Sequence, residues 1–242
     1  MEKPTYDTAE IKALVNSSGL RHIAFIMDGN GRWATGRGLP REVGHKKGAE
    51  AFRRVLTYCA DIGIKVVTVY AFSTENWKRP EREVNALMHL LGSYLDEAFV
   101  DIKKNGIRFI FIGEKSGLPS ALAERIRKLE EETAIYENTV NVALNYGGRA
   151  EIVRAVNDLL SSGKTQITED DISAALYTAP TGDPDLIVRS ASEYRLSNFL
   201  LWQAAYSEFW FTDTLWPDFD AKDINEAVVA FAGRKRKYGG LS

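Results

Sequence analysis

Short runs of β-branched and aromatic residues alternate along the chain with longer segments in which apolar residues recur at helical spacing. The short runs predict β-strands at 22–27, 65–72, 107–112, 139–144, 185–188 and 208–211. The longer segments predict helices at 45–61, 81–104, 120–133, 149–160, 169–176 and 221–234. This alternation predicts an α/β fold, with a mostly parallel six-stranded central sheet that helices cover on both faces.

The helix predicted at 81–104 carries one continuous apolar face, and two interpretations of it stay open. The face is formed by Val84, Leu87, Met88, Leu91, Leu95, Ala98, Phe99 and Ile102. Such a face usually packs into the core, but the wall of a hydrophobic tunnel would have the same pattern.

No repeat, low-complexity tract or proline-rich linker divides the chain, so a single domain is expected over residues 21–242. The polar residues 1–20 are expected to form an N-terminal extension. The longest apolar runs, 66–72 and 227–232, are much shorter than the roughly 20 residues that a membrane helix needs. A soluble, cytoplasmic protein is therefore expected.

Composition and charge narrow the choice of partners. With 45% hydrophobic and 26% charged residues in 242, the chain is long enough to close one sizeable core. Its formal net charge of −2 gives no overall attraction to nucleic acid or anionic lipid, so anion binding must come from local clusters of the 31 Lys and Arg residues. The single cysteine, Cys59, excludes an internal disulfide and is expected to be a buried structural thiol.

The segment that follows the first strand has the features of a diphosphate site with a divalent cation. It contains Asp28, Gly29, Asn30, Gly31, Arg32 and Trp33, then Arg37 and Arg41, before a helix near His45. Glycine backbone N–H groups, a helix N-terminus and arginines all bind phosphate oxygens. The Asp28 carboxylate would repel a diphosphate unless Mg²⁺ lay between them. Alternatively, Asp28 caps a turn that the glycines shape.

Two nucleotide-binding patterns are tested and rejected in this region. The spacing Gly29-x-Gly31-x-x-Ala34 matches a weak dinucleotide fingerprint, but the following helix is predicted to start about ten residues late. No acidic residue ends the second strand to hold a ribose. The run 44–48 lacks the Gly-Lys-Ser/Thr of a phosphate-binding loop.

Two further polar segments are predicted at the same edge of the sheet, where an open α/β fold binds its ligands. The second strand is followed by Ser73, Thr74, Glu75, Asn76, Trp77, Lys78, Arg79 and Pro80. Helix capping by Ser73 or Thr74 accounts for part of that run, but not for Trp77 together with Arg79.

The fifth strand is followed by a loop with Arg189, Arg195 and Ser197, a second candidate anion site. The simpler alternative for this loop is an exposed Arg189–Glu193 ion pair. Glu208, beside an aromatic strand, either joins Asp28 at the metal or is a solvated strand-end carboxylate.

Several ungapped motifs in this order resemble bacterial undecaprenyl diphosphate synthases, a family of cis-prenyltransferases, from about residue 20 to 240. The motifs are 22–33, 73–80, 143–149, 183–189, 195–202 and 211–218. The resemblance implies Asp28 as a Mg²⁺ and diphosphate ligand and Glu208 as a second metal ligand. The remaining implied site residues fall into three groups. The allylic substrate would be held by the backbone of Gly29, Asn30, Gly31 and Arg32, with Trp33, Arg41, His45, Trp77 and Arg79; Ser73, Thr74, Glu75 and Asn76 would line the reacting centre; Arg189, Arg195, Leu196 and Ser197 would bind isopentenyl diphosphate.

The resemblance also implies a product, a partner and a location. The product would be undecaprenyl diphosphate made from farnesyl diphosphate, a lipid carrier for cell-wall polysaccharides that grows in a tunnel beside the 81–104 helix. The enzyme would be a homodimer in peripheral contact with the inner face of the membrane, with 209–211 and the carboxyl-terminal segment at the interface. Asn76, a diphosphate oxygen that Asn76 positions and His45 all remain candidate proton acceptors.

One loop departs from the family pattern: residues 190–193 read Ser-Ala-Ser-Glu where Thr-Ser-Gly-Glu is usual. Loss of that glycine is expected to stiffen or reshape the second substrate site. The rival functions are a non-catalytic prenyltransferase-like subunit and a nicotinamide-dependent oxidoreductase. A non-catalytic subunit would not need Asp28 or the Arg189–Arg195 pair. The presence of all three residues argues against that alternative.

Overall fold

The computed structural model describes residues 6–234, apart from the side chains of residues 96–105. All six predicted strands are present, and each end lies within two residues of its prediction. They are β1 (His22–Ile26), β2 (Val66–Ser73), β3 (Ile107–Ile112), β4 (Asn138–Tyr146), β5 (Leu186–Arg189) and β6 (Glu208–Phe211). The strands form one sheet in the order β3-β4-β2-β1-β5-β6, and every neighbouring pair is parallel. The predicted six-stranded parallel sheet is confirmed.

The helices match the prediction over most of the chain. They are α1 (Thr8–Ser18), α2 (Asn30–Thr35), α3 (Arg41–Asp61), α4 (Glu81–Asn105), α5 (Ser120–Thr133), α6 (Gly148–Ser161), α7 (Glu169–Ala175) and α8 (Ala221–Ala232), with short 3₁₀ helices η1 (Thr74–Lys78), η2 (Gln203–Tyr206) and η3 (Trp216–Asp218). Helix α3 begins four residues before its predicted start at 45, directly after Pro40, whose fixed φ suits the residue before a first turn. Helices α1 and α2 were not predicted.

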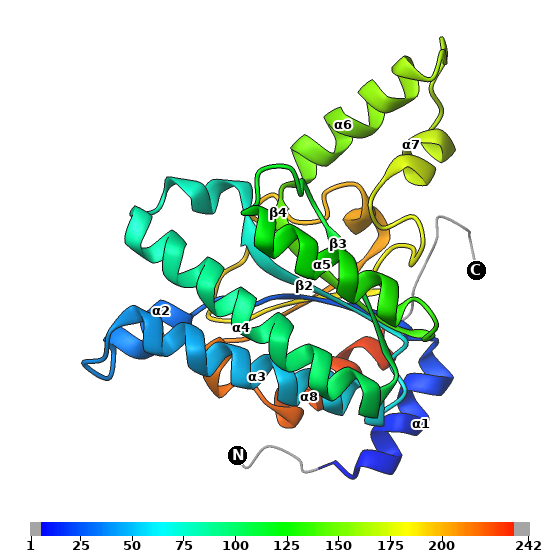
Figure 1. Ribbon diagram of the computed structural model, residues 1–242. Coiled ribbons are helices and arrows are strands. Elements are labelled where there is room, and N and C mark those ends of the chain that lie inside the picture. The colour runs from blue at the N-terminus through cyan, green and yellow to red at the C-terminus, as the bar shows by residue number, and fades with distance from the viewer. Residues whose placement is uncertain (1–5, 235–242) are drawn as a thin grey trace.

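Alternation along the strands divides the core into two layers. In β1, Ile23 and Phe25 join the larger cluster, whereas Ala24 and Ile26 join the smaller one on the other face. Side chains from α1, α3, α4, α5 and α8 pack into the larger cluster. Figure 1 shows α3, α4 and α5 in front of the sheet and α6 and α7 extending away from it. The smaller face is covered mainly by the connection between β5 and β6, so helices do not cover both faces equally.

Helix α1 lies within the stretch expected to be an extension, and it contributes to the core. Asp7 forms a capping box with Glu10, and Gly19 ends the helix at φ 73°. Its apolar face places Ile11 and Val15 in the larger cluster, fully or almost fully buried. The helix packs against α8, from the other end of the chain.

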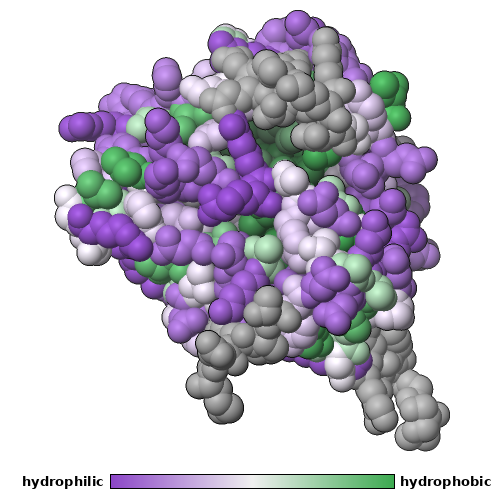
Figure 2. Space-filling model, turned by 90° about the horizontal axis from the view of Figure 1, so that it is seen from below, coloured by the Kyte–Doolittle hydropathy of each residue, from purple (hydrophilic) through white to green (hydrophobic). Residues whose placement is uncertain are grey.

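Within the described residues, none of the helices combines the length and apolar composition that crossing a membrane requires. In the view of Figure 2, hydrophilic residues cover most of the face, and hydrophobic residues show in the hollows between them.

Candidate active site

The parallel register brings the three predicted polar segments to one edge of the sheet. Ile26 at the end of β1 pairs with Arg189 at the end of β5, and Asp28 follows two residues later. Ser73 at the end of β2 pairs with Tyr146 at the end of β4. Since all these strands run in the same direction, their carboxyl ends and the loops that follow share this edge.

Asp28 lies between two guanidinium groups. Its Oδ2 accepts a hydrogen bond from Arg189 Nη2 at 3.0 Å, and Arg32 Nη2 lies 3.5 Å from Oδ1. Oδ1 also accepts from the backbone N–H of Gly29 at 2.6 Å, so part of the predicted turn-capping role is present. Gly29 is required here, because φ is 102° and an added Cβ would lie 2.9 Å from Ala191 and Leu215 side-chain atoms.

Arg189 connects two of the segments. Its side chain is only 4% exposed, and its Nη1 donates to Ser197 Oγ at 2.8 Å and to the backbone oxygen of Arg195. The proposed surface pair with Glu193 is wrong, since Glu193 pairs with Arg195 and, at 3.5 Å, with Arg32. Arg189 is therefore a buried bridge between Asp28 and the 195–197 loop.

The loop after β5 has left-handed backbone at residues other than glycine. Ala191 has φ 70°, Ser192 has φ 55°, and Ser197 has φ 50°. Ser192 stands where the resembled family usually has glycine, and the backbone there keeps a conformation that favours glycine. A serine in this conformation is strained, and its N–H donates a hydrogen bond to Thr212 O at 2.9 Å.

The segment after β2 folds into η1, which Ser73 caps. The backbone N–H of Ser73 donates to Asn76 Oδ1 at 3.1 Å, which completes a capping box. Trp77 donates from Nε1 to Asn145 Oδ1 at 2.7 Å and packs edge-on against Phe72. Ser73 is therefore a cap, as predicted, but of η1 and not of the following helix α4, and Thr74 lies inside η1.

Glu75 lies in the same turn and links it to the loop after β5. Its Oε1 accepts from Asn198 Nδ2 at 2.9 Å, and Thr74 Oγ1 donates to Oε2 at 3.2 Å. Burial raises the pKa of Glu75, but these hydrogen bonds outweigh it and lower the pKa overall.

Helix α2 begins at Asn30, directly after the Gly29 turn, so the predicted late helix start is wrong. The helix has only six residues, and Arg32 and Trp33 lie within it. Trp33 donates from Nε1 to Asp218 Oδ1 at 2.7 Å, which ties α2 to η3. The short helix turns the chain so that Arg41 opens α3 beside the site.

Three predicted substrate-binding residues gather around one carboxylate that was not predicted, that of Glu83. Arg79, Arg41 and His45 lie 3.0, 3.5 and 3.8 Å from its Oε1. Burial, followed by the charge of Arg79, lowers the pKa of His45 from 6.5, so its imidazole is neutral at pH 7.

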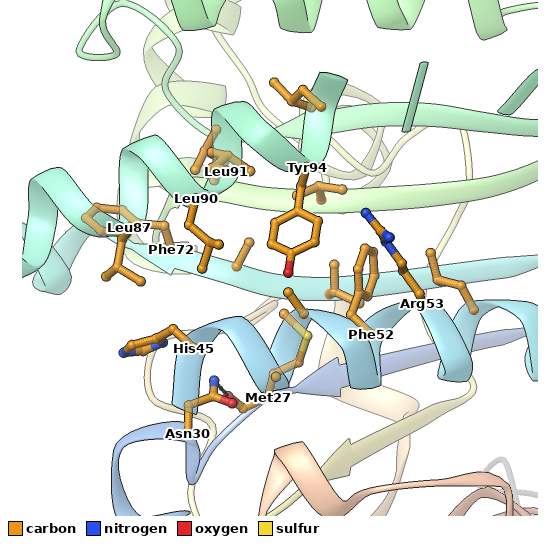
Figure 3. Close-up of a pocket in the computed structure, with 18 of the residues that line it drawn as sticks. Met27, Asn30, His45, Phe52, Arg53, Phe72, Leu87, Leu90, Leu91 and Tyr94 are labelled. Atoms are coloured by element: carbon orange, nitrogen blue, oxygen red, sulfur yellow. Dashed lines mark hydrogen bonds between the residues drawn. The ribbon is translucent and has the colours of Figure 1, made fainter. Parts of the chain in front are cut away.

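A cavity of about 240 Å³ begins beside these groups and runs between α3, α4 and the sheet. Figure 3 shows His45 and Asn30 at one end of it and Arg53 at the other, with Tyr94 pointing from α4 toward α3. Leu87, Met88, Leu91 and Leu95 line the cavity, whereas Val84 is buried in the core. The apolar face of α4 therefore serves both predicted purposes; Ala98, Phe99 and Ile102 lie outside the described side chains.

Glu208 does not lie near Asp28 in this chain. It pairs with Leu186 at the start of β5, whereas Arg189, which contacts Asp28, is at the other end of that strand. Three residues of β-strand separate those ends by roughly 10 Å. Glu208 instead accepts a hydrogen bond from Arg234 at 2.6 Å. The prediction that Glu208 joins Asp28 at one metal does not hold within a single chain.

The donor set at the site fits a magnesium ion that is held jointly with a substrate. Among the described residues, no group of three or more His, Cys, Asp or Glu side chains is arranged to hold a metal. Asp28 supplies one carboxylate that is 31% exposed beside two arginines. Mg²⁺ typically binds through one or two carboxylates with substrate phosphates and water, so Asp28 with a bound diphosphate suffices.

Three residues of this edge were missed by sequence reasoning: Glu83, Asn145 and Asn198. Glu83 follows Arg79 by four residues, a spacing that signals an ion pair on a helix. Asn145 and Asn198 have φ of 48° and 65°, which no sequence pattern shows. Cys59 is buried as predicted, and burial raises the pKa of its thiol to about 12.

Comparison with known proteins shows the family to which this chain belongs. The family profile described as "Putative undecaprenyl diphosphate synthase" matches residues 26–239. An isoprenyl transferase of Fusobacterium nucleatum subsp. nucleatum is 52% identical over 222 residues, which cover 91% of this chain and 96% of that protein. The chain belongs to the isoprenyl transferase family. The predicted membership in this cis-prenyltransferase family is confirmed.

Two solved structures, each 33% identical to this chain, share its fold. Lavandulyl diphosphate synthase from Lavandula x intermedia, in complex with dimethylallyl diphosphate, superposes with a TM-score of 0.88 at 33% identity, covering 93% of this chain and 100% of that one. A "probable undecaprenyl diphosphate synthase" from Campylobacter jejuni has a TM-score of 0.79 at 33% identity, covering 91% and 99%. The oxidoreductase alternative is therefore wrong.

Proposed function

We propose that this protein condenses isopentenyl diphosphate repeatedly onto an allylic diphosphate, with farnesyl diphosphate as the starter and undecaprenyl diphosphate as the product. The observation that carries the proposal is the apolar cavity whose lining includes Met27 and Asn30, the residues on either side of the Asp28–Gly29 turn, together with His45. Such a site suits a substrate with a diphosphate at one end and a growing hydrocarbon at the other. In the neighbouring lavandulyl diphosphate synthase, the ligand is also an allylic diphosphate. The long product would serve as a lipid carrier in cell-wall synthesis.

Asp28 is proposed to hold Mg²⁺ together with the allylic diphosphate. The ion, when bound, would supply positive charge that stabilises the leaving diphosphate. Arg32, Arg41, Arg79 and the backbone of residues 29–32 would orient that diphosphate, with Trp33, Trp77 and His45 beside it. The ion pairs of Arg32, Arg41 and Arg79 cluster on one edge of the sheet, which supports a shared ligand.

The second diphosphate is proposed to lie on the 189–197 loop. Arg195 is 61% exposed and therefore accessible to a ligand, whereas the buried Arg189 would fix Ser197 and Leu196 relative to Asp28. With both substrates in place, the double bond of isopentenyl diphosphate attacks the allylic carbon as the carbon–oxygen bond to the diphosphate breaks. A proton then leaves the new chain to restore a double bond.

The acceptor of this proton is proposed to be a diphosphate oxygen. Asn76 Oδ1 already accepts the Ser73 N–H, and a neutral amide is a poor base, so Asn76 would hold the 73–76 turn at the reacting centre. His45 is neutral and partly buried, and it fits a position beside the allylic diphosphate. Orientation of both substrates in one geometry would set the cis double bond.

A homodimer forms part of the proposal. Strand β6 is an edge strand, and Phe209, Trp210 and Phe211 on it are all partly exposed, which is a common feature of a surface that pairs with a second copy. Glu208 at the start of β6 would serve a metal site only if it reached that site from a second copy. Because the product would be very apolar, the proposal also includes contact of the enzyme with the inner face of the membrane.

The test is to incubate the full chain with farnesyl diphosphate, labelled isopentenyl diphosphate and Mg²⁺, and to size the extracted products, with EDTA in a parallel reaction. Long labelled chains that disappear in EDTA are the expected result. A folded protein that binds farnesyl diphosphate but makes no chain, even with Mg²⁺, would contradict the proposal and favour a non-catalytic binding subunit.

A further inference from the structure

Glu83 places a negative charge among Arg41, Arg79 and His45. The proposed function assigns these residues to the allylic-diphosphate site. Glu83 lies in the first turn of α4, and its side chain is 18% exposed. Arg79, Arg41 and His45 come within 4 Å of the same oxygen, Oε1. A carboxylate repels a diphosphate, because both are negatively charged. The presence of Glu83 beside the proposed diphosphate site therefore needs a physical explanation.

The two arginines and the neutral imidazole around Glu83 come from different elements. Arg41 and His45 come from α3, whereas Arg79 precedes α4. The Arg41 guanidinium also lies against the backbone of Gly31, since a Cβ added there would be 2.8 Å from Arg41 Cζ. Arg41 thus contacts the Asp28–Gly31 turn as well as Glu83.

One carboxylate oxygen cannot satisfy all the donors around it. His45 Nε2 is buried and makes no hydrogen bond with any described group, while Arg41 is 3.5 Å from the oxygen and 53% exposed. Only Arg79, at 3.0 Å, is at hydrogen-bond distance with good geometry. The cluster therefore retains donor capacity that a ligand with several anionic oxygens would use.

We propose that Glu83 is the resident counterion of the allylic-diphosphate site and that a bound diphosphate displaces it from Arg41, Arg79 and His45. The proposal rests on the proposed function for the identity of the ligand. Glu83 neutralises the cations in the empty site and competes with the diphosphate for them. Its competition weakens the binding of diphosphate groups, and this helps the released diphosphate to leave between condensation cycles.

A purely structural role for Glu83 predicts the opposite result. If the carboxylate only held Arg79 and Arg41 in place, its removal would loosen them and weaken diphosphate binding. If it competes with the ligand, its removal strengthens binding. The sign of the change in affinity therefore separates the two roles.

The experiment measures binding of inorganic pyrophosphate to the full chain by titration calorimetry, without Mg²⁺, in wild type and in Glu83→Gln. Loss of the competing ion pairs is expected to lower the Kd of Glu83→Gln by about three- to tenfold. Glu83→Asp, which keeps the charge on a shorter side chain, is expected to fall between these two proteins. An unchanged or higher Kd in Glu83→Gln, or no binding to either protein, overturns the proposal.

Glu81→Gln is the matched control, because it removes the same charge from the same turn of α4. Its Kd is expected to change by less than about twofold, since screened charges at longer range contribute little. An equal gain in both variants would mean that general charge, rather than the Glu83 contacts, governs the affinity, and would overturn the proposal. Thermal melting of each variant verifies that it is folded.

Prenyl-transfer assays run in parallel keep the two proposals separate. In Glu83→Gln, the KM for farnesyl diphosphate is expected to fall, while kcat stays the same or falls as diphosphate release slows. If wild type binds pyrophosphate but forms no prenyl chain, the proposed function fails while the counterion result still stands. If chains form but Glu83→Gln binds pyrophosphate no more tightly, only the counterion proposal fails.

Discussion

At the scale of single residues, Asp28 combines two roles that different substitutions separate. Asp28→Asn keeps an acceptor for Arg189 but removes the charge that would hold Mg²⁺. Turnover is expected to fall at least about 10²-fold, the usual cost of losing a group that stabilises developing charge. The initial rate of label incorporation measures the loss of turnover, and thermal melting in parallel measures any loss of stability.

Asp28→Ala is the companion variant, because it also removes the oxygen that accepts the hydrogen bond from the buried Arg189. A destabilisation of about 1–3 kcal/mol beyond that of Asp28→Asn is expected. Near wild-type turnover in either variant would rule out Asp28 as the metal ligand.

Ser192 is predicted to be a strained residue that glycine would relieve. Its φ is 55°, and a non-glycine residue in the left-handed region costs roughly 1–2 kcal/mol. Ser192→Gly is expected to raise the free energy of unfolding by about 0.5–1 kcal/mol, less than the full strain because glycine also makes the unfolded chain more flexible. Chemical denaturation measures it. Ser162→Gly, at φ −78°, is the control and is expected to be neutral or destabilising.

His22 makes the fold sensitive to acid. It is 2% exposed, its Nε2 bonds to Thr68 Oγ1 at 2.7 Å, and burial lowers its pKa from 6.5 to about 4. Between these values the unfolded chain binds more protons than the folded one, so stability falls as the pH falls. The gap between the two pKa values corresponds to about 3 kcal/mol.

Denaturation at a series of pH values from 7 to 4 measures this contribution. His22→Asn is expected to flatten the pH dependence in that window, whereas His89→Asn, at an exposed position, is expected to keep it. Equal slopes in wild type and His22→Asn would show that His22 does not cause the acid sensitivity.

At the scale of elements, α1 is expected to be essential for stability although it precedes the sheet. Ile11 is completely buried in the larger cluster, so Ile11→Ala is expected to destabilise the protein by about 2–5 kcal/mol. Lys12→Ala, one residue away on the exposed side, is expected to stay within about 0.5 kcal/mol of wild type. Urea unfolding of both variants tests it, and similar midpoints would mean that α1 does not contribute to the core.

The hydrophobic pattern predicted some of the helices and strands and missed others. Residues 107–112 and 208–211 match their predicted strands at both ends, because a short apolar run bounded by loop residues has few alternative placements. The pattern missed α2, because it has only six residues and the polar Asn30, Arg32 and Thr35 among them leave it without an apolar face. It missed α1 because Ile11, Leu14 and Val15, although at helical spacing, are the few large apolar residues in a mostly polar stretch.

At the scale of the whole molecule, the cavity between α3, α4 and the sheet is expected to set the product length. Phe109 and Val142 both line it. Val142→Phe reduces the volume and is expected to shift products toward shorter chains, whereas Phe109→Leu enlarges it and is expected to shift them toward longer ones. Sizing of the labelled products by chromatography checks both.

The initial rate of the first condensation is the internal control for this pair, since neither residue lies at the Asp28 edge. It is expected to change by less than about threefold in both variants. Identical product lengths in wild type and both variants would mean that this cavity does not hold the growing chain.

The parallel direction of the strands and the meeting of the polar segments at one edge followed from the sequence, whereas the order of the strands did not. A parallel sheet places the residues after β1, β2 and β5 at one edge, so Asp28, Ser73 and Arg189 were expected together before any side chain was placed. The partners within that edge were not predictable. Arg189 had Glu193 as its nearest candidate along the chain, but its partner is Asp28, 161 residues away.

The sequence by itself determined the fold class, the family and the three segments of the site, because periodicity and local motifs depend on neighbours along the chain. Tertiary structure alone decided which charges meet. It separated Glu208 from Asp28 by the length of a strand, and it gathered Arg41, His45 and Arg79 around Glu83. Ion pairing depends on distances of a few ångströms between distant segments, and only the packed arrangement of α3, α4 and the sheet fixes those distances.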